Sequence, residues 1–346
     1  MIPDGRKPKH TGQQGANMDY SKLRSLSALF AFAVVVFLLA AGCSNNVPGD
    51  TFDTLNDNAG NDVNGDSEID WDEDINWDDD TWSPGAGWNL VWSDEFDSGF
   101  DSNTWAREVL MNPYNDEWQV YPGGDSTDNA WVENGKMIIK AEWNGTTHAP
   151  GNYTSARVIS NPGGTDGTSS ADGKTFRYGK IAARIRLPYG KGIWPAFWML
   201  GDNISETGGD TDWPASGEID ILETGNRNDP DYGQRHVSGT IHYENADGGH
   251  SYATPRKMNL PEGQKFADSF HVFEIEWDNQ QILWKVDGVQ MGTPVDITPH
   301  YRSEFHKPFY VIFNIAVGGH FTHDPDHSTP FPQYMFIDWI RHYEKE

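Results

Sequence analysis

From about residue 85 onward, short apolar runs alternate with clusters of glycine, proline, asparagine and aspartate, and this alternation constrains the fold most strongly. The runs are rich in β-branched and aromatic residues, as β-strands are. No long stretch shows the periodicity of a helix. The sequence therefore predicts an all-β fold, with strands expected at residues 137–141, 181–187, 271–277, 282–286 and 309–317.

The arrangement of these strands can also be anticipated. Asp287 and Gly288 stand between two apolar runs, and Asp-Gly in that position is a strong signal for a β-hairpin. Many short strands spread over about 260 residues favour two packed sheets. We therefore expect residues 85–346 to form a two-sheet jelly-roll sandwich, with a concave substrate groove on one sheet face.

Three acidic residues, Glu218, Asp220 and Glu223, lie close together in one apolar segment. Side chains of a strand alternate between faces, so Glu218 and Asp220 point to the same side and Glu223 is out of phase. One extra residue at a bulge near Ile221 and Leu222 would return Glu223 to that side. The sequence therefore predicts a bulged strand with three acids on one face.

Carboxylates this close together raise one another's pKa. A retaining glycosidase needs that effect, because one carboxyl must stay protonated as an acid while another, about 5–5.5 Å away, is ionised as a nucleophile. The small residues 215–217 leave room for a ligand, and Trp194, Trp198 and Trp213 lie nearby in the sequence. The alternative is an ordinary strand with an acidic solvent-facing side.

Charge and cysteine content disfavour other classes of protein. The formal net charge is −27, and we expect no nucleic-acid partner because proteins that bind polyanions are basic. Much of this charge lies in residues 50–80, which hold 13 Asp and Glu and no Lys or Arg. Cys43 is the only cysteine of the chain, so it can form neither an internal disulfide nor a cysteine zinc cluster.

Residues 1–43 are interpreted as a lipoprotein signal peptide. Residues 28–42 are 15 consecutive apolar residues, too few to span a bilayer comfortably but typical of a signal-peptide core. Met18 suits the true start better than Met1. The small residues before Cys43 resemble a bacterial lipobox, so we expect an exported lipoprotein acylated at Cys43, in the outer membrane or at the cell surface. A membrane helix with an incidental cysteine is the alternative.

Residues 44–84 are expected to form an acidic disordered linker. They are rich in Asp, Asn and Gly, and such a composition cannot bury enough apolar surface to offset the chain entropy. A calcium loop is the alternative, because acidic and amide side chains occupy ligand-like positions. Ser67 stands where that loop needs glycine. The ligand-like positions are Asp62, Asn64, Asp66, Glu68, Asp70 and Glu73.

The segment Glu-Ile-Asp-Ile-Leu-Glu at 218–223 resembles the active-site signature of glycoside hydrolase family 16. His320 and Phe321 depart from the most similar branch, the bacterial laminarinases, which usually have Asn-Trp there. This departure concerns the substrate subsites rather than the chemistry. The resemblance covers about residues 86–345 and continues, in order, through residues 91–96, 178–188, 192–200, 239–243, 314–319, 329–333 and 338–343.

The resemblance implies a role for each acid of the trio. Glu218 would be the nucleophile that forms a covalent glycosyl-enzyme, and Glu223 the general acid and then the base for the incoming water. Asp220 would be their electrostatic helper. The residues alone identify the trio but not which glutamate plays which part. No cofactor is implied for catalysis.

Six further residues are implied to bind substrate. Aromatic faces cover the apolar face of a sugar ring, so Trp194 is interpreted as a sugar platform, whereas Trp198 is expected in the core. For each of the others, a structural role is the alternative. Trp213 matches a tryptophan beside the reacting sugar, and His242 matches a position near the cleavage point. The residues that match the donor side of the groove are Arg157, Asn115 and Glu117.

The family often carries a structural calcium ion on the convex side, and Glu95, Gly135 and Asp338 match that site. Oxygen ligands suit calcium. Asp338 stands in an apolar segment, where an unpaired carboxylate would be costly. The alternative partner for Asp338 is an arginine in a salt bridge.

Taken together, these features predict a monomeric retaining endo-β-1,3-glucanase that hydrolyses laminarin-like or mixed-linked β-glucan. It would contact a membrane through its lipid anchor only. Other activities of the family, such as lichenase, agarase or carrageenase, stay open. So do a non-catalytic surface glucan-binding protein and a calcium-dependent adhesion or structural lipoprotein.

Overall fold

The computed structural model describes residues 80–160 and 173–346. Cys43, residues 1–79 and the calcium-loop positions lie outside these ranges, so the predictions made for them stay predictions. Within the described ranges, no helix combines the length and the apolar character needed to cross a membrane.

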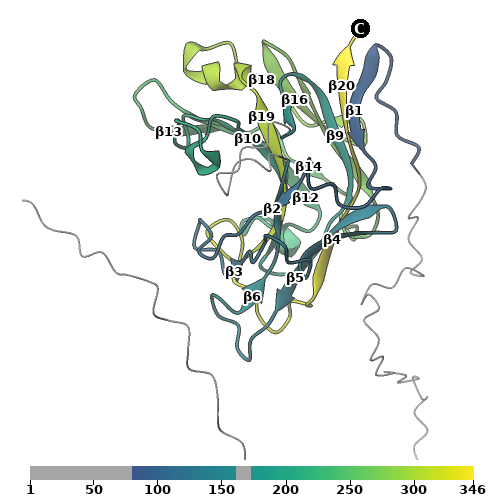
Figure 1. The fold of residues 1–346 in the computed structure, drawn as a ribbon, viewed down its shortest axis with the longest axis vertical. Coiled ribbons are helices and arrows are strands. Elements are labelled where there is room, and N and C mark those ends of the chain that lie inside the picture. Colours follow the sequence, from purple (N-terminus) through teal and green to yellow (C-terminus); the bar gives the residue numbers. More distant parts are fainter. Residues whose placement is uncertain (1–79, 161–172) are drawn as a thin grey trace, which may run out of the picture. The chain divides into compact units, whose positions relative to one another are not determined.

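One sheet has eleven strands, of which β1, β4, β9 and β20 are drawn on the right of Figure 1. They are β1 (Trp88–Asp94), β3 (Gln119–Val120), β4 (Ala130–Glu133), β5 (Lys136–Trp143), β6 (Tyr153–Thr154), β9 (Gly179–Arg186), β15 (His271–Trp277), β16 (Gln281–Val286), β17 (Val289–Gln290), β18 (Val295–Asp296) and β20 (Gln333–Lys345). The main path of this sheet runs β17–β16–β15–β9–β20–β5–β6–β3.

The second sheet has nine strands. They are β2 (Ala106–Arg107), β7 (Arg157–Ile159), β8 (Thr175–Phe176), β10 (Ile193–Gly201), β11 (Glu218–Glu223), β12 (His236–Glu244), β13 (His250–Ala253), β14 (Met258–Asn259) and β19 (Phe309–Val317). Its path runs β13–β12–β11–β10–β19–β7–β2. In the part of the chain that the structure describes, three short 3-10 helices lie in the connections: η2 (Ser205–Thr207), η3 (Pro230–Gly233) and η4 (His300–His306).

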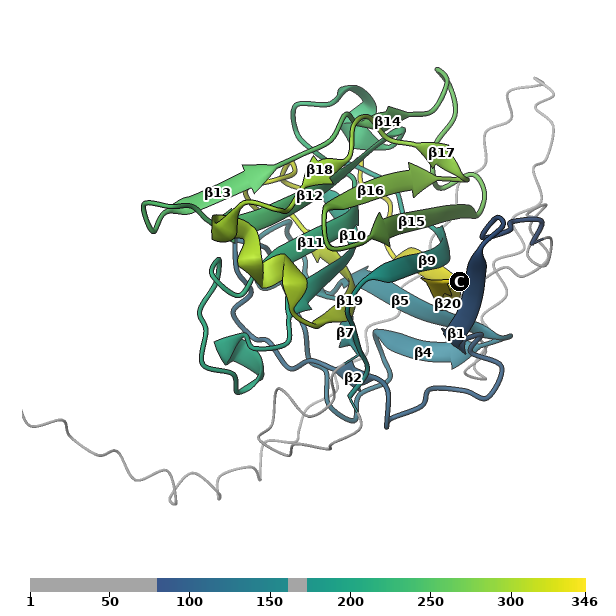
Figure 2. The same cartoon turned by 90° about the horizontal axis from the view of Figure 1, so that it is seen from above.

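The predicted all-β jelly-roll sandwich is confirmed. Each of the five expected apolar runs is a strand, and β15 and β19 have the predicted bounds. The hairpin is confirmed as well, because Val286 of β16 pairs with Val289 of β17 across Asp287 and Gly288. Figure 2 shows β16, β15 and β9 side by side, in the order of the sheet.

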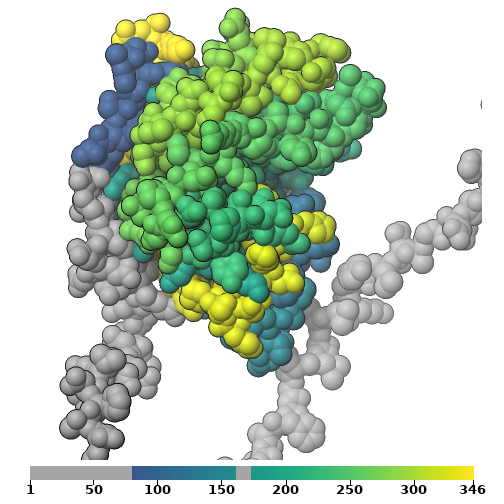
Figure 3. Space-filling view, turned by 180° about the vertical axis from the view of Figure 1, so that it is seen from behind, coloured from purple at the N-terminus to yellow at the C-terminus, as the bar shows by residue number. Residues whose placement is uncertain are grey.

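The hydrophobic core lies between the sheets and takes alternate residues from their strands. Phe197 and Met199 of β10 contribute to it, as do Ile181 and Ala183 of β9. The intervening residues of β10 face away from the core, and this second face of the nine-stranded sheet carries the groove. In the space-filling view from behind, green segments of the C-terminal half cover much of the surface (Figure 3).

Candidate active site

Strand β11 contains the predicted bulge. Its register with β10 pairs Trp198 with Asp220 and Phe197 with Leu222, so Ile221 is the extra residue. Ile221 and Leu222 both pack into the core. All three acids line the groove. The bulge therefore restores Glu223 to the face of Glu218 and Asp220.

The opposite sheet supports this bulge. A bulge interrupts the strand ladder and frees backbone groups, and the indole Nε1–H of Trp284 donates a 2.7 Å hydrogen bond to the backbone carbonyl of Asp220. Gly239 of β12 makes room for this contact, because a Cβ there would overlap the indole ring. Trp284 comes from β16, so both sheets determine the backbone of the acidic strand.

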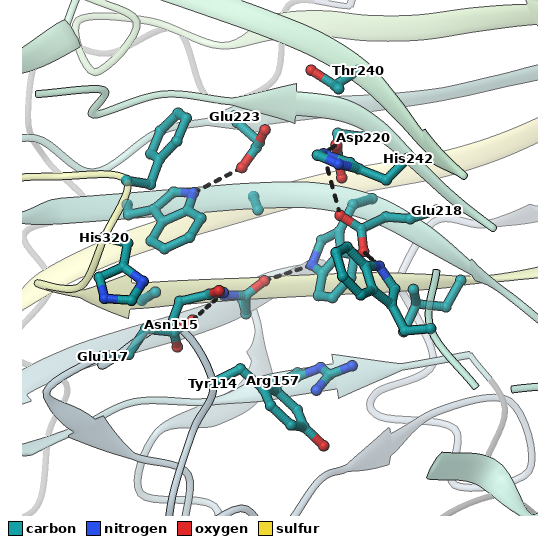
Figure 4. A pocket seen from close by; sticks show the side chains of 18 of the residues that line it. Tyr114, Asn115, Glu117, Arg157, Glu218, Asp220, Glu223, Thr240, His242 and His320 are labelled. Carbon is teal, nitrogen blue, oxygen red and sulfur yellow. Dashed lines mark hydrogen bonds and ion pairs between the residues drawn. The ribbon is translucent and has the colours of Figure 1, made fainter. Parts of the chain in front are cut away.

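The groove has a volume of about 850 Å³ and crosses the strands of the sheet. Figure 4 shows the acid trio between Thr240 of β12 on one side and Tyr114 and Arg157 on the other. A chain-like ligand that follows the groove would therefore pass over the trio.

Each glutamate of the trio is held by a tryptophan. The Nε1–H of Trp213 donates to Glu218 Oε2 at 2.8 Å, and the Nε1–H of Trp194 donates to Glu223 Oε1 at 3.1 Å. Hydrogen bonds to a charged acceptor are stronger than neutral ones and fix its orientation. The two carboxyls are therefore positioned before any ligand binds.

His242 lies over the centre of the trio (Figure 4). Its Nε2 is 3.3 Å from Asp220 Oδ2 and 3.7 Å from Glu218 Oε1, and its Nδ1 is 2.9 Å from Nε2 of His250. This geometry favours the tautomer with a proton on Nε2, which points to the carboxylates, while Nδ1 accepts from His250. His250 was not anticipated from the sequence.

The protons of the three acids are coupled. Burial raises the pKa of Glu218 to about 8, and the neighbouring Asp220 adds to the rise. Burial also raises the pKa of Glu223 to about 7, although His242 opposes it. Burial and the charge of Glu223 raise the pKa of Asp220 well above its usual range. At neutral pH the trio therefore retains protons that isolated carboxyls would have lost.

The segment that carries these acids matches a known protein family. Residues 130–341 match the model of the glycosyl hydrolases family 16. The chain belongs to this family. The matched range is more than half of the chain and includes the complete strand β11, so the resemblance expected from residues 218–223 is confirmed.

The chain is similar to glucanases within the family. It is 36% identical over 273 residues to a β-glucanase of Rhodothermus marinus, covering 74% of this chain and 85% of that protein. It is 32% identical over 291 residues to glucan endo-1,3-β-glucosidase A1 of Niallia circulans, covering 75% of this chain but only 38% of that protein. The laminarinase catalytic domain of Thermotoga maritima aligns with a TM-score of 0.60 and 36% identity, covering 75% of this chain and 99% of the domain.

The donor-side residues expected from the family line the groove together. Asn115 and Glu117 lie on the loop before β3, and burial raises the pKa of Glu117. Arg157 also lines the groove but is only 4% exposed. Its guanidinium is paired with Glu108 at 2.8 Å and with Glu206 at 3.3 Å. Arg157 therefore holds the end of the groove in shape rather than offering a free cation to a sugar.

The expectation that Trp198 belongs to the core holds only in part. Its ring packs against a hydrophobic cluster that includes Ile159, Leu200 and Tyr310, yet it also lines the groove. Trp198 alternates with Phe197 and Met199, so it shares the groove face with Trp194, and its Nε1–H donates to Asn314 at 2.7 Å. Asn314 in turn donates to the hydroxyl of Tyr121. Asn314 was not anticipated from the sequence, although a polar residue in the otherwise apolar run 309–317 is a signal for a side chain on the opposite face.

Trp194 lines the groove, and its interpretation as a sugar platform stays a prediction. Phe321 stacks on the indole with ring centroids 4.7 Å apart, and the Nε1–H is directed at Glu223. One face of the ring is therefore already covered. Trp213 remains 45% exposed and packs beside His250, which leaves it open to a ligand.

The proposed calcium ligands face cations of the protein itself. Asp338 Oδ2 lies 2.6 Å from Arg184 and Oδ1 3.2 Å from Lys136, while both oxygens of Glu95 accept from Arg341. These carboxylates fit the salt-bridge alternative better than a calcium site, because a positive side chain repels a bound cation. Gly135 lies in the turn before Lys136 and adds no carboxylate.

One other group of side chains has metal-like spacing. Donor atoms of Glu218, Asp220 and His242 lie within 4.8 Å of one another. The glutamate and aspartate are the carboxyls whose protons are coupled in the groove, so we assign no metal to this group.

Proposed function

We propose that this chain is a retaining endo-β-1,3-glucanase that hydrolyses laminarin-like or mixed-linked β-glucan by double displacement. The observation that carries the proposal is the bulged strand β11, which presents Glu218, Asp220 and Glu223 to one groove. The glucanases among the relatives support the substrate class. The polysaccharide would lie across the strands, over the trio.

In the first step, Glu218 attacks the anomeric carbon and forms a covalent glycosyl-enzyme. Glu223 donates its proton to the departing glycosidic oxygen, so that the leaving sugar departs as a neutral alcohol. The pKa of Glu223, raised to about 7, keeps that proton available under neutral and mildly acidic conditions.

In the second step, the deprotonated Glu223 removes a proton from water, which attacks the anomeric carbon and releases Glu218. Two inversions at that carbon give net retention of configuration. The cycle restores the proton of Glu223 and requires no cofactor.

Asp220 would regulate the charge on the nucleophile. Its carboxyl shares a hydrogen bond with Glu218. This bond raises the pKa of Glu218 and lowers that of Asp220, so it favours the proton on Glu218. The Trp213 N–H and His242 favour the ionised form of Glu218. These two contacts oppose the effect of Asp220 and make an anionic nucleophile accessible inside a buried site.

The roles of the two glutamates can be separated by azide rescue. With an activated aryl β-glucoside oligosaccharide, azide should rescue Glu218→Ala and give the α-glycosyl azide, because azide then replaces the missing nucleophile directly. Azide should rescue Glu223→Ala and give the β-glycosyl azide, because it attacks the glycosyl-enzyme. The reverse pattern would exchange the two roles, and full activity of either variant without azide would refute the assignment.

The substrate class needs a separate experiment. Product analysis on laminarin, mixed-linkage β-glucan and agarose should show internal cleavage of laminarin, with products of retained configuration seen by proton NMR at early times. Activity on agarose without activity on laminarin would overturn the choice of substrate.

We also propose that the mature protein is an exported lipoprotein anchored through Cys43, with residues 44–84 as the tether. The apolar segment before Cys43 and the acidic composition after it support this proposal. In a bacterial host, wild-type protein should label with palmitate and sediment with membranes, and Cys43→Ala should do neither. Unchanged membrane association of the variant would refute lipid anchoring. Sedimentation of the released enzyme would measure its mass and so test whether it is the expected monomer.

A further inference from the structure

The contact between Trp194 and Glu223 depends on the orientation of one ring. An indole has a single N–H, which lies in the ring plane, so a small rotation of the side chain moves it off the acceptor. Here it donates to Glu223 Oε1 at 3.1 Å. The Phe321 ring lies against the indole with an interplanar angle of 23° and centroids 4.7 Å apart. A stacked neighbour limits rotation of the indole, since rotation would drive one ring into the other.

The backbone before and after Phe321 is fixed by a glycine turn and by hydrogen bonds. After β19 the chain turns at Gly318 and Gly319, whose φ angles of 66° and 96° are unfavourable for other residues. The Arg227 guanidinium donates to the carbonyls of Gly319 and Thr322, and the Arg227 backbone N–H donates to the carbonyl of Phe321 at 3.0 Å.

The hydrogen bond also distinguishes the two oxygens of Glu223. Oε1 accepts from the indole N–H. A carboxyl oxygen that carries a proton is a poorer acceptor, so the transferable proton is favoured on Oε2. If the indole moved, both oxygens would become equivalent and the carboxyl could rotate. Correct placement of the proton is a geometric requirement of general acid catalysis.

We propose that Phe321 is a positioning residue for the acid–base carboxyl: through its stack on Trp194 it keeps the indole N–H on Glu223. The inference rests on the acid–base role proposed above for Glu223. It assigns a function to the segment in which this chain departs from the usual laminarinase pattern. Phe321 acts through Trp194 and is not itself a reacting group.

Several charged groups also act on Glu223 and must be considered in any pH profile. Glu218 and Asp220 lie on the same strand, and the Glu218 charge raises the pKa of Glu223. His242 from β12 and Lys257 lower it, as does the Trp194 hydrogen bond. Of these contributions, a change at Phe321 would alter only the hydrogen bond from Trp194.

The test compares Trp194→Phe, which keeps a ring but lacks the N–H, with Phe321→Leu, which keeps bulk but lacks the ring. With laminarin, kcat should fall about tenfold for Trp194→Phe and several-fold for Phe321→Leu, with little change in KM. Loss of a donor that favours ionised Glu223 should raise its pKa. The alkaline limb of the kcat profile should therefore move upward by about one pH unit for Trp194→Phe and by less for Phe321→Leu.

The double variant gives the decisive comparison. If Phe321 acts through Trp194, then Phe321→Leu should cause no further loss of kcat in the Trp194→Phe background. Additive losses would overturn the proposal, and so would an effect of Phe321→Leu on KM alone, which would make Phe321 a sugar-contact residue. Phe100→Leu is the matched control, because Phe100 packs beneath Arg107 and does not line the groove.

A second readout needs no turnover. In a protein labelled with ¹⁵N at tryptophan, the indole resonance missing from Trp194→Phe identifies Trp194. In the wild type this resonance should titrate with Glu223, and in Phe321→Leu it should shift toward the position of a free indole. If Phe321→Leu is folded and this resonance is unchanged, the positioning role is refuted. Because this measurement uses the unliganded protein, it separates failure of this inference from failure of the proposed activity.

Discussion

Replacing Glu218 by glutamine is expected to stabilise the folded protein at alkaline pH, although the change removes the proposed nucleophile. Glutamine keeps the size of the side chain and an oxygen that can accept from the Trp213 N–H. It removes a buried charge. Active sites commonly hold such unfavourable groups, so a loss of activity can accompany a gain in stability.

The sign and size of the effect follow from the pKa of Glu218, which burial raises from an ordinary value of 4.5 to about 8. Below pH 4.5 the group is protonated in both the folded and the unfolded chain, so this carboxyl adds no penalty to folding. Between pH 4.5 and 8 the unfolded chain ionises first, and the free energy of unfolding falls as pH rises. Above pH 8 the penalty is complete.

The full difference in pKa corresponds to about 5 kcal/mol at 1.36 kcal/mol per unit. Water in the open groove and local rearrangement reduce such penalties, so we expect about 2 kcal/mol. For a domain of this size, that free energy raises the melting temperature by about 4–8 °C.

Differential scanning calorimetry of wild type and Glu218→Gln at matched pH values would measure this difference. We expect equal melting temperatures below pH 4.5 and a higher one for the variant above pH 8. Glu262→Gln, at an exposed turn, is the control for loss of a carboxylate as such. A difference that does not change with pH, or a variant less stable at alkaline pH, would refute the reasoning.

Three further predictions concern the surroundings of the site. In Gly239→Ala the added methyl group should overlap the Trp284 indole. The variant should lower the free energy of unfolding by about 1–3 kcal/mol in urea titrations and reduce kcat by shifting the bulge. An unchanged kcat would argue against support of the bulge by the second sheet. Arg157→Met should lower the free energy of unfolding by about 3–5 kcal/mol because it leaves Glu108 buried without its partner, and adding Glu108→Gln should recover part of that loss. A calcium chelator should leave the melting temperature unchanged, because Asp338 is already paired with cationic side chains; a fall that calcium reverses would show that a cation binds there.

Much of the fold was predictable because its determinants are local. Short apolar runs rich in β-branched and aromatic residues predicted strands such as β15 and β19, and the Asp-Gly turn signal predicted the hairpin at Asp287. The trio was predictable for the same reason, since strand alternation and one extra residue suffice to place Glu218, Asp220 and Glu223 on a common face. The same alternation places Trp198 on the groove face, because its neighbour Phe197 points into the core.

What the sequence by itself determined is therefore several of the long strands, the family and the acids of the site. Only the tertiary structure decided what holds those acids in place: Trp284 donates to Asp220 across 64 positions of sequence, and Phe321 reaches Trp194 from the loop after β19. It also decided that Arg157 forms ion pairs with Glu108 and Glu206. The physical reason is that local patterns fix which way a side chain points, whereas its partner depends on which distant segments the two sheets bring together.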